Sequence, residues 1–81
     1  MLEKILELLR AGKTYQIGHY QAGYTYLSYD KDRKVFIELI KDHSVDIYNP
    51  SVTETLFTET QFKEFLLQNF KLDEILKNLS D

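Results

Sequence analysis

Residues 15–48, YQIGHYQAGYTYLSYDKDRKVFIELIKDHSVDIY, decide the fold of this chain. Within them, short runs of β-branched and aromatic residues are separated by breaks at Gly23, at residues 30–32 and at residues 42–44. Runs of this kind, bounded by Gly, Asp and Ser, are typical of antiparallel strands that follow one another in sequence. We therefore expect a four-stranded antiparallel meander. Its strands are expected near residues 14–20, 24–29, 34–41 and 45–49.

The breaks between these runs are suited to tight turns. Gly23 closes a three-residue turn at the position that requires a positive φ. The break after the second strand contains no Gly and favours a type I turn. Pro50 cannot donate to a strand ladder, so it is expected to end the fourth strand. Residues 51–57, SVTETLF, alternate weakly. They form either a fifth strand at the edge of the sheet or a loop that packs its apolar residues inward.

An amphipathic helix precedes the meander. Its apolar residues follow the spacing of one helical face, and they are Leu2, Ile5, Leu6 and Leu9. Gly12 follows and is a natural left-handed stop. The pattern favours a helix that packs on the core, with a helix that joins two copies of the chain as the alternative.

After the meander, Thr58 and Gln61 have the spacing of a capping box, which predicts a helix start. Apolar residues at helical spacing follow: Phe62, Phe65, Leu66 and Phe70, then Leu72, Ile75, Leu76 and Leu79 on a new phase. The phase changes near residues 69–71, which favours two helices or one sharply broken helix. We therefore expect an α+β fold with the element order αββββαα, and residues 1–81 as a single domain.

Composition excludes several classes of protein. There is no cysteine, so neither a disulfide framework nor a thiolate metal site is available. The first ten residues, MLEKILELLR, carry charges at every turn, which is unlike a signal peptide or a membrane span. A core filled by six Tyr and five Phe is expected to stabilise the short chain. We expect a soluble, cytoplasmic protein without a membrane partner.

Side chains alternate between the two faces of a strand, so the turns assign each residue to a face. With turns centred on Ala22 and on residues 31–32, Leu27 lies beside Ile17 and Phe36. One face then holds Tyr15, Ile17, Leu27, Tyr29, Phe36, Ile40, Val45 and Ile47. The other holds Tyr20, Tyr24, Tyr26, Val35, Ile37, Leu39 and Tyr48. Neither face is polar, so either helices from both ends of the chain cover both faces or one face binds a partner.

No catalytic, metal or cofactor motif is present in the sequence. His19 and His43 are expected on different strands or turns, and neither belongs to a metal-binding spacing. Asp42, His43 and Asp46 cluster in sequence, but acids at such a break commonly cap backbone N–H groups. We therefore expect no enzyme, no metal and no cofactor.

The second face, rich in Tyr, suggests binding to another protein, because Tyr is enriched at recognition surfaces. We expect contacts from Tyr20, Tyr24, Tyr26 and Tyr48. The layout resembles that of several small inhibitors encoded by phages and mobile elements. This resemblance in architecture implies a small regulator or inhibitor of a larger protein, and it assigns no role to any residue.

Two alternatives remain for the same face. The tyrosines could stack the bases of a single-stranded nucleic acid, or the face could join two copies of the chain. Nucleic-acid binding is disfavoured because the net charge is −3 and the five acids of residues 13–48 balance the five bases. The acidic excess lies in residues 49–81, where it suits solvated helix faces and first helical turns.

Overall fold

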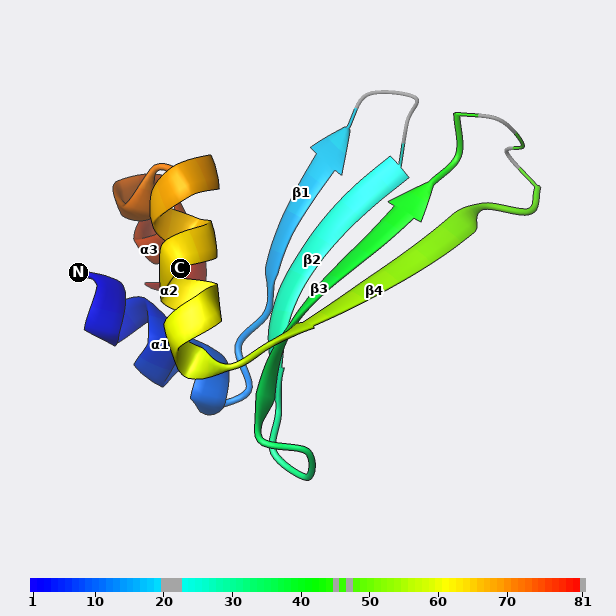
Figure 1. Cartoon of the computed structure of the whole chain (residues 1–81). Helices are drawn as coiled ribbons and strands as arrows, with labels where there is room; N and C mark the ends of the chain where they lie inside the picture. The colour runs from blue at the N-terminus through cyan, green and yellow to red at the C-terminus, as the bar shows by residue number, and fades with distance from the viewer. Residues whose placement is uncertain (20–22, 45, 47, 81) are drawn as a thin grey trace.

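An N-terminal helix, a four-stranded antiparallel sheet and two C-terminal helices make up the chain (Figure 1). The computed structural model describes residues 1–19, 23–44, 46 and 48–80. The elements are α1 (Leu2–Arg10), β1 (Tyr15–His19), β2 (Gly23–Asp30), β3 (Val35–Asp42), β4 (Ser51–Phe57), α2 (Glu59–Asn69) and α3 (Leu72–Ser80). This order confirms the predicted αββββαα layout. None of the described helices combines the length and the apolar character needed to span a membrane.

The sheet has the strand order β1-β2-β3-β4, with every neighbouring pair antiparallel. Leu27 of β2 lies opposite Tyr15 and Glu38, two residues away from the pairs expected from the turns. At the second turn the reason is local. The Asp30 carboxylate accepts hydrogen bonds from the N–H groups of Asp32 (2.9 Å) and Arg33 (3.2 Å), which closes a turn over residues 31–34. Because a shift of two residues preserves alternation, the predicted faces of β1, β2 and β3 are unchanged.

The fourth strand predicted at residues 45–49 is wrong, since the strand that pairs with β3 is Ser51–Phe57. Residues 45 and 47 lie outside the described residues, and residues 46, 48 and 49 are not in a strand. The Asp46 carboxylate instead accepts hydrogen bonds from the N–H groups of Tyr48 (2.9 Å) and Asn49 (3.2 Å). These side-chain bonds favour a turn over a ladder. Pro50 therefore precedes a strand, where no ladder bond is required of it.

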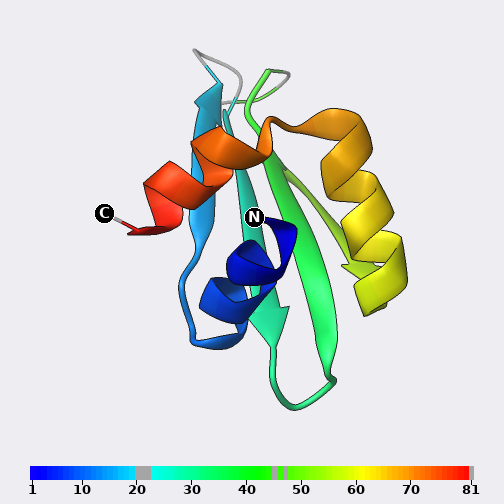
Figure 2. The same ribbon diagram turned by 90° about the vertical axis from the view of Figure 1, so that its left-hand side faces the viewer.

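All three helices lie on one face of the sheet (Figures 1 and 2). α1 contacts β2 and α3, α3 contacts β1, and α2 contacts β3 and β4. The core between the layers contains Ile5, Leu6 and Leu9 of α1, which meet Leu27 and Phe36 of the sheet. The core-facing role predicted for the first helix is confirmed. Of the two alternatives left open for the apolar sheet, helices on both faces is wrong, because α1, α2 and α3 all lie on the same face.

Aromatic rings fill the layer between the sheet and α2. The rings of Phe36 and Phe62 are stacked, with centroids 4.6 Å apart and planes 6° apart. Phe57 and Phe65 are stacked beside them, 4.7 Å apart. Phe36 and Phe62 are both buried. Each such ring removes a large apolar area from water, which compensates for the small size of the domain.

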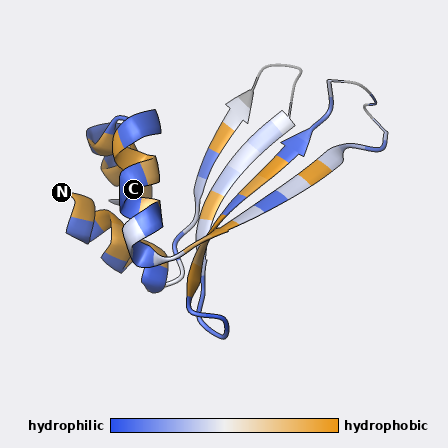
Figure 3. Ribbon diagram, viewed as in Figure 1, coloured by the Kyte–Doolittle hydropathy of each residue, from blue (hydrophilic) through white to orange (hydrophobic). Residues whose placement is uncertain are grey.

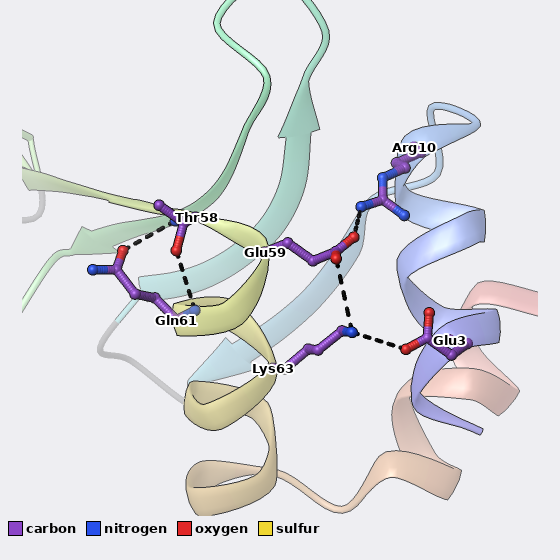
Figure 4. Close-up of polar contacts among 6 residues, drawn as sticks. All are labelled: Glu3, Arg10, Thr58, Glu59, Gln61 and Lys63. Carbon is purple, nitrogen blue, oxygen red and sulfur yellow. Dashed lines mark hydrogen bonds and ion pairs between the residues drawn. The ribbon is translucent and has the colours of Figure 1, made fainter.

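The ends of the helices are formed as the sequence predicts. Gly12 has a φ of 100°, and the N–H of Lys13 donates to the carbonyl of Leu8 in a left-handed stop after α1. At α2, Thr58 accepts from the N–H of Gln61 while the Gln61 side chain accepts from the N–H of Thr58 (Figure 4). The extended backbone of Phe70 separates α2 from α3, so the predicted break gives two helices.

Ion pairs join the surfaces of α1 and α2 (Figure 4). Arg10 pairs with Glu59, and Lys63 Nζ lies 3.0 Å from Glu3 Oε1. The guanidinium of Arg10 also lies 5.2 Å from the centre of the Phe36 ring. Exposed pairs of this kind contribute at most about 1 kcal/mol each. They orient two helices that the core already holds together.

Candidate interaction surface

The face of the sheet opposite the helices, called the outer face below, is the candidate site. The alternation of residues along each strand places one set of apolar side chains there: Tyr24 and Tyr26 of β2, Val35, Ile37 and Leu39 of β3, and Val52 and Leu56 of β4. We call this set the apolar band. Hydrophobic residues recur along the strands as well as along the helices (Figure 3). None of the band residues is fully buried, and none of them belongs to the core beneath the helices.

The most exposed members of the band lie at its edges. Tyr24 is 41% exposed, Val52 57% and Leu56 44%. On β3, Ile37 and Leu39 are partly buried by their neighbours in the sheet, and the exposed Lys41 lies between Tyr24 and Val52. Single exposed apolar residues are common on proteins, whereas this set extends across three neighbouring strands.

The structure brings together two of the four tyrosines that were predicted to bind a partner. Tyr24 and Tyr26 lie side by side on the outer face, with ring centroids 6.1 Å apart. The Tyr24 ring also lies over Gly18 of β1, where an added Cβ would be 3.5 Å from the ring. Aromatic cover of a glycine on an edge strand is a recognised way of stabilising it.

The other two tyrosines are not placed with this pair. Tyr48 is 86% exposed and lies in the connection between β3 and β4, so its predicted position on a strand is wrong. Tyr20 lies outside the described residues. Tyr48 remains accessible to a partner, but from the connection and not from the sheet.

Charged residues border the apolar band. Arg33 Nε donates to Asp30 Oδ2 at 2.8 Å, and Arg33 Nη2 lies 3.5 Å from Glu54 Oε1. The pairing register places Ile37 and Leu56 between the rows of Asp30 and Glu54, so the Arg33 side chain extends along this part of the outer face. Its hydrogen bond holds the pKa of Asp30 below the usual value and raises the pKa of Arg33. An apolar centre with a charged border is the usual composition of a protein interface.

β4 contributes residues that the sequence did not assign to the site. Val52, Glu54 and Leu56 point to the outer face because Phe57 points to the core. The alternation of residues 51–57 was visible in the sequence, and the segment contains no proline or glycine. The competing segment at residues 45–49 contains Asp46 and Asn49, which favour turns. This difference in turn-favouring residues was the signal in the sequence that could have placed the fourth strand at residues 51–57.

A hollow of about 400 Å³ lies between the end of β4 and α2. It is lined by Leu56, Phe57, Gln61, Glu64, Phe65 and Gln68. The hollow is open to solvent and mixes amide and carboxylate groups with two aromatic rings. Its lining contains no nucleophile paired with a base, and it adjoins the apolar band at Leu56.

Two acidic side chains at and after the end of β3, Asp42 and Asp46, have hydrogen-bond partners. The hydrogen bonds from Ser44 hold the pKa of Asp42 below its usual value, and those from Tyr48 and Asn49 do the same for Asp46. Both acids therefore cap backbone groups, as expected for this segment. Burial raises the pKa of Glu38, which lies on the helix-facing side of β3 opposite Leu27. Across the described part of the chain, no three His, Asp or Glu residues gather as metal ligands would.

Comparison of the chain with protein-family models, with curated proteins and with solved structures found no match. The outer face and its chemistry therefore carry the functional argument alone.

Proposed function

We propose that this chain is a non-catalytic interaction module that binds a larger protein through its outer face. One observation carries the proposal: all three helices lie on the opposite face, so none of them covers the apolar band (Figures 1 and 2). Apolar side chains that are exposed to water have an unfavourable hydration free energy. A partner protein that covered the apolar band would remove this contribution.

The chemistry of the residues in the apolar band favours binding to a protein. Tyr24 and Tyr26 combine a large apolar ring with a hydroxyl group, which is the chemistry enriched at binding hot spots. Tyr48 offers a third ring from the adjoining connection. Arg33, Asp30 and Glu54 provide a charged border that favours one orientation of the partner.

The proposal extends to the class of protein and its location. A domain of 81 residues with one apolar face is suited to blocking a surface of a larger protein, as small inhibitors of the phage and mobile-element type do. The absence of cysteine from the whole sequence is compatible with a reducing compartment, and we place the protein in the cytoplasm.

Binding measurements on single tyrosine variants test the proposal. The immobilised chain is used to capture its partner from a lysate of the native host, and the purified partner is then titrated by calorimetry. We expect Tyr24→Ala or Tyr26→Ala to weaken binding at least about five-fold, the loss typical of a hot spot. Folding of each variant is checked by circular dichroism.

Leu67→Ala is the matched control, because Leu67 is an apolar residue 61% exposed on α2, away from the sheet. Its removal is expected to leave the affinity unchanged. Unchanged affinity for both tyrosine variants, or equal loss with Leu67→Ala, would remove the outer face from the binding site.

A second candidate is the stacking of nucleic-acid bases on the same two rings. The 6.1 Å separation of Tyr24 and Tyr26 is the observation in its favour. The neighbouring charges oppose it, since Glu54 and Asp30 border the band alongside Arg33 and Lys41. Titration with a labelled single-stranded oligonucleotide at two salt concentrations distinguishes the two functions. Saturable binding with a steep salt dependence would replace the protein-binding proposal.

A further inference from the structure

β4 is an open edge of the sheet. It is the last strand in the order, and it pairs with β3 without interruption from Ser51 to Phe57. Edge strands of proteins are usually shortened, bulged, or protected by charged side chains, above all Lys, or by Pro. β4 has a regular ladder of pairs, contains neither Lys nor Pro, and carries one charge, Glu54, which is paired with Arg33. Its outward N–H and C=O groups are therefore presented as a template for another strand.

The sequence of β4 is nearly the same in both directions. Residues 52–56 read VTETL, with Glu54 at the centre, a Thr on each side and an aliphatic residue at each end. Two antiparallel copies centred on Glu54 would place Thr53 of each copy opposite Thr55 of the other. Val52 of each copy would lie opposite Leu56 of the other. Cross-strand pairs of Thr with Thr and of aliphatic residues stabilise antiparallel sheets.

The central pair of Glu54 residues is the one unfavourable element of this arrangement, because like charges directly opposite each other repel. The fold already supplies a counter-charge, since Arg33 Nη2 lies 3.5 Å from Glu54 Oε1. A two-fold axis through the Glu54 pair would therefore bring together two carboxylates with a guanidinium beside each. The repulsion is reduced but not removed.

We infer that β4 is a self-pairing edge, through which two copies of this chain form a symmetric dimer with one continuous sheet. Val52 and Leu56, now 57% and 44% exposed, cover each other across the axis. The helices of both copies lie on one side of the joined sheet, and the two outer faces become continuous on the other. An edge pair buries less surface than a standard interface, so the dissociation constant is expected between about 1 µM and 1 mM.

Cysteine cross-linking tests the pairing and its register. The chain has no cysteine, so one substitution gives a single thiol per copy. In the inferred pair, residue 54 lies opposite its own copy at a Cα distance of about 4.5–5.5 Å, within the range of a disulfide. Glu54→Cys is expected to form a covalent dimer under mild oxidation at a protein concentration of about 100 µM.

Thr53→Cys is the matched control on the same strand. Residue 53 lies opposite residue 55 of the other copy, so the two thiols introduced at position 53 would be separated by more than about 7 Å and would point to the other face. Little covalent dimer is expected. Equal cross-linking of both variants, or cross-linking at 53 and not at 54, would overturn the inferred pairing.

Sedimentation equilibrium tests the dimer without a cross-link. Glu54→Gln removes the central repulsion, so it is expected to tighten the dimer about five-fold. Val52→Lys places a charge on the edge strand and is expected to abolish the dimer. Gln16→Lys, the same kind of change on the β1 edge, is expected to leave it unchanged. A wild-type chain that remains monomeric at about 1 mM would overturn the inference, as would a dimer that Val52→Lys does not affect. Neither result bears on the partner-binding test, which uses Tyr24 and Tyr26.

Discussion

At the scale of the residue, Gly23 shows how tightly the backbone of the sheet is packed. Its φ of 121° is disfavoured for any side chain, and an added Cβ would overlap the carbonyl oxygen of Lys41 on the neighbouring strand. We expect Gly23→Ala to lower the free energy of unfolding by about 1–3 kcal/mol from the backbone strain alone, and by more if the strands must separate. Urea unfolding monitored by circular dichroism measures the loss.

Gly12 is the appropriate control for this substitution. It also has a positive φ, of 100°, but an added Cβ would meet no atom within 4 Å. Gly12→Ala should therefore show the cost of the backbone conformation without the overlap. If Gly23→Ala costs no more than Gly12→Ala, the close approach of Gly23 to Lys41 is not a constraint on the sheet.

Glu38 is the second residue with a measurable consequence, because it places a carboxyl group on the helix-facing side of β3. Burial raises its pKa in the folded state above the unfolded value, so the charged form disfavours folding. The free energy of unfolding therefore increases as the pH falls from the pKa of Glu38 in the folded state to its pKa in the unfolded state. It decreases again as the pH rises through the same interval. Glu38→Gln removes this penalty.

We expect Glu38→Gln to be more stable than the wild type at pH 7. The difference should disappear at a pH below the ordinary glutamate pKa, where the wild-type carboxyl is protonated in both states. Urea unfolding of both proteins at pH 7 and at pH 3.5 measures it. A difference that is the same at both pH values would show that the effect comes from packing and not from the charge.

At the scale of the element, the sequence predicted the helices closely and the strands less evenly. The periodicity of residues 2–9 and the Thr58–Gln61 capping box are local signals, and α1 and α2 begin and end close to the positions they indicate. Strand registers depend on turn geometry, so the capping of residues 32 and 33 by Asp30 shifted the predicted pairs by two residues. The faces were still correct because alternation has a period of two.

β4 was the strand that local patterns could not decide. Residues 45–49 and 51–57 both alternate, and choosing between them requires knowing that the Asp46 carboxylate caps the N–H groups of Tyr48 and Asn49. The same uncertainty affected the candidate site. Tyr24 and Tyr26 were assigned to the correct face, whereas Val52, Glu54 and Leu56 were not identified as part of it.

At the scale of the whole molecule, the decisive fact is the placement of three helices on one face of a sheet that is apolar on both. The aromatic residues of α2 pack on this face: Phe65 stacks on Phe57 at the end of β4, and Phe62 stacks on Phe36 of β3. The result is a molecule with one structural face and one free face.

Phe36 and Ile37 test this division, since they are neighbours on β3 and point to opposite faces. Phe36 is buried and stacked on Phe62, so Phe36→Leu leaves space in the core and should lower the free energy of unfolding by more than about 1 kcal/mol. Ile37→Thr keeps a β-branched residue on the outer face, and its cost should stay within about 0.5 kcal/mol. Both are measured by urea unfolding at several protein concentrations from about 1 to 50 µM, because a contribution from the inferred dimer would make the free energy of unfolding depend on concentration. A large loss for Ile37→Thr would mean that the outer face is packed in the isolated chain, and the surface proposed for binding would then be part of the core.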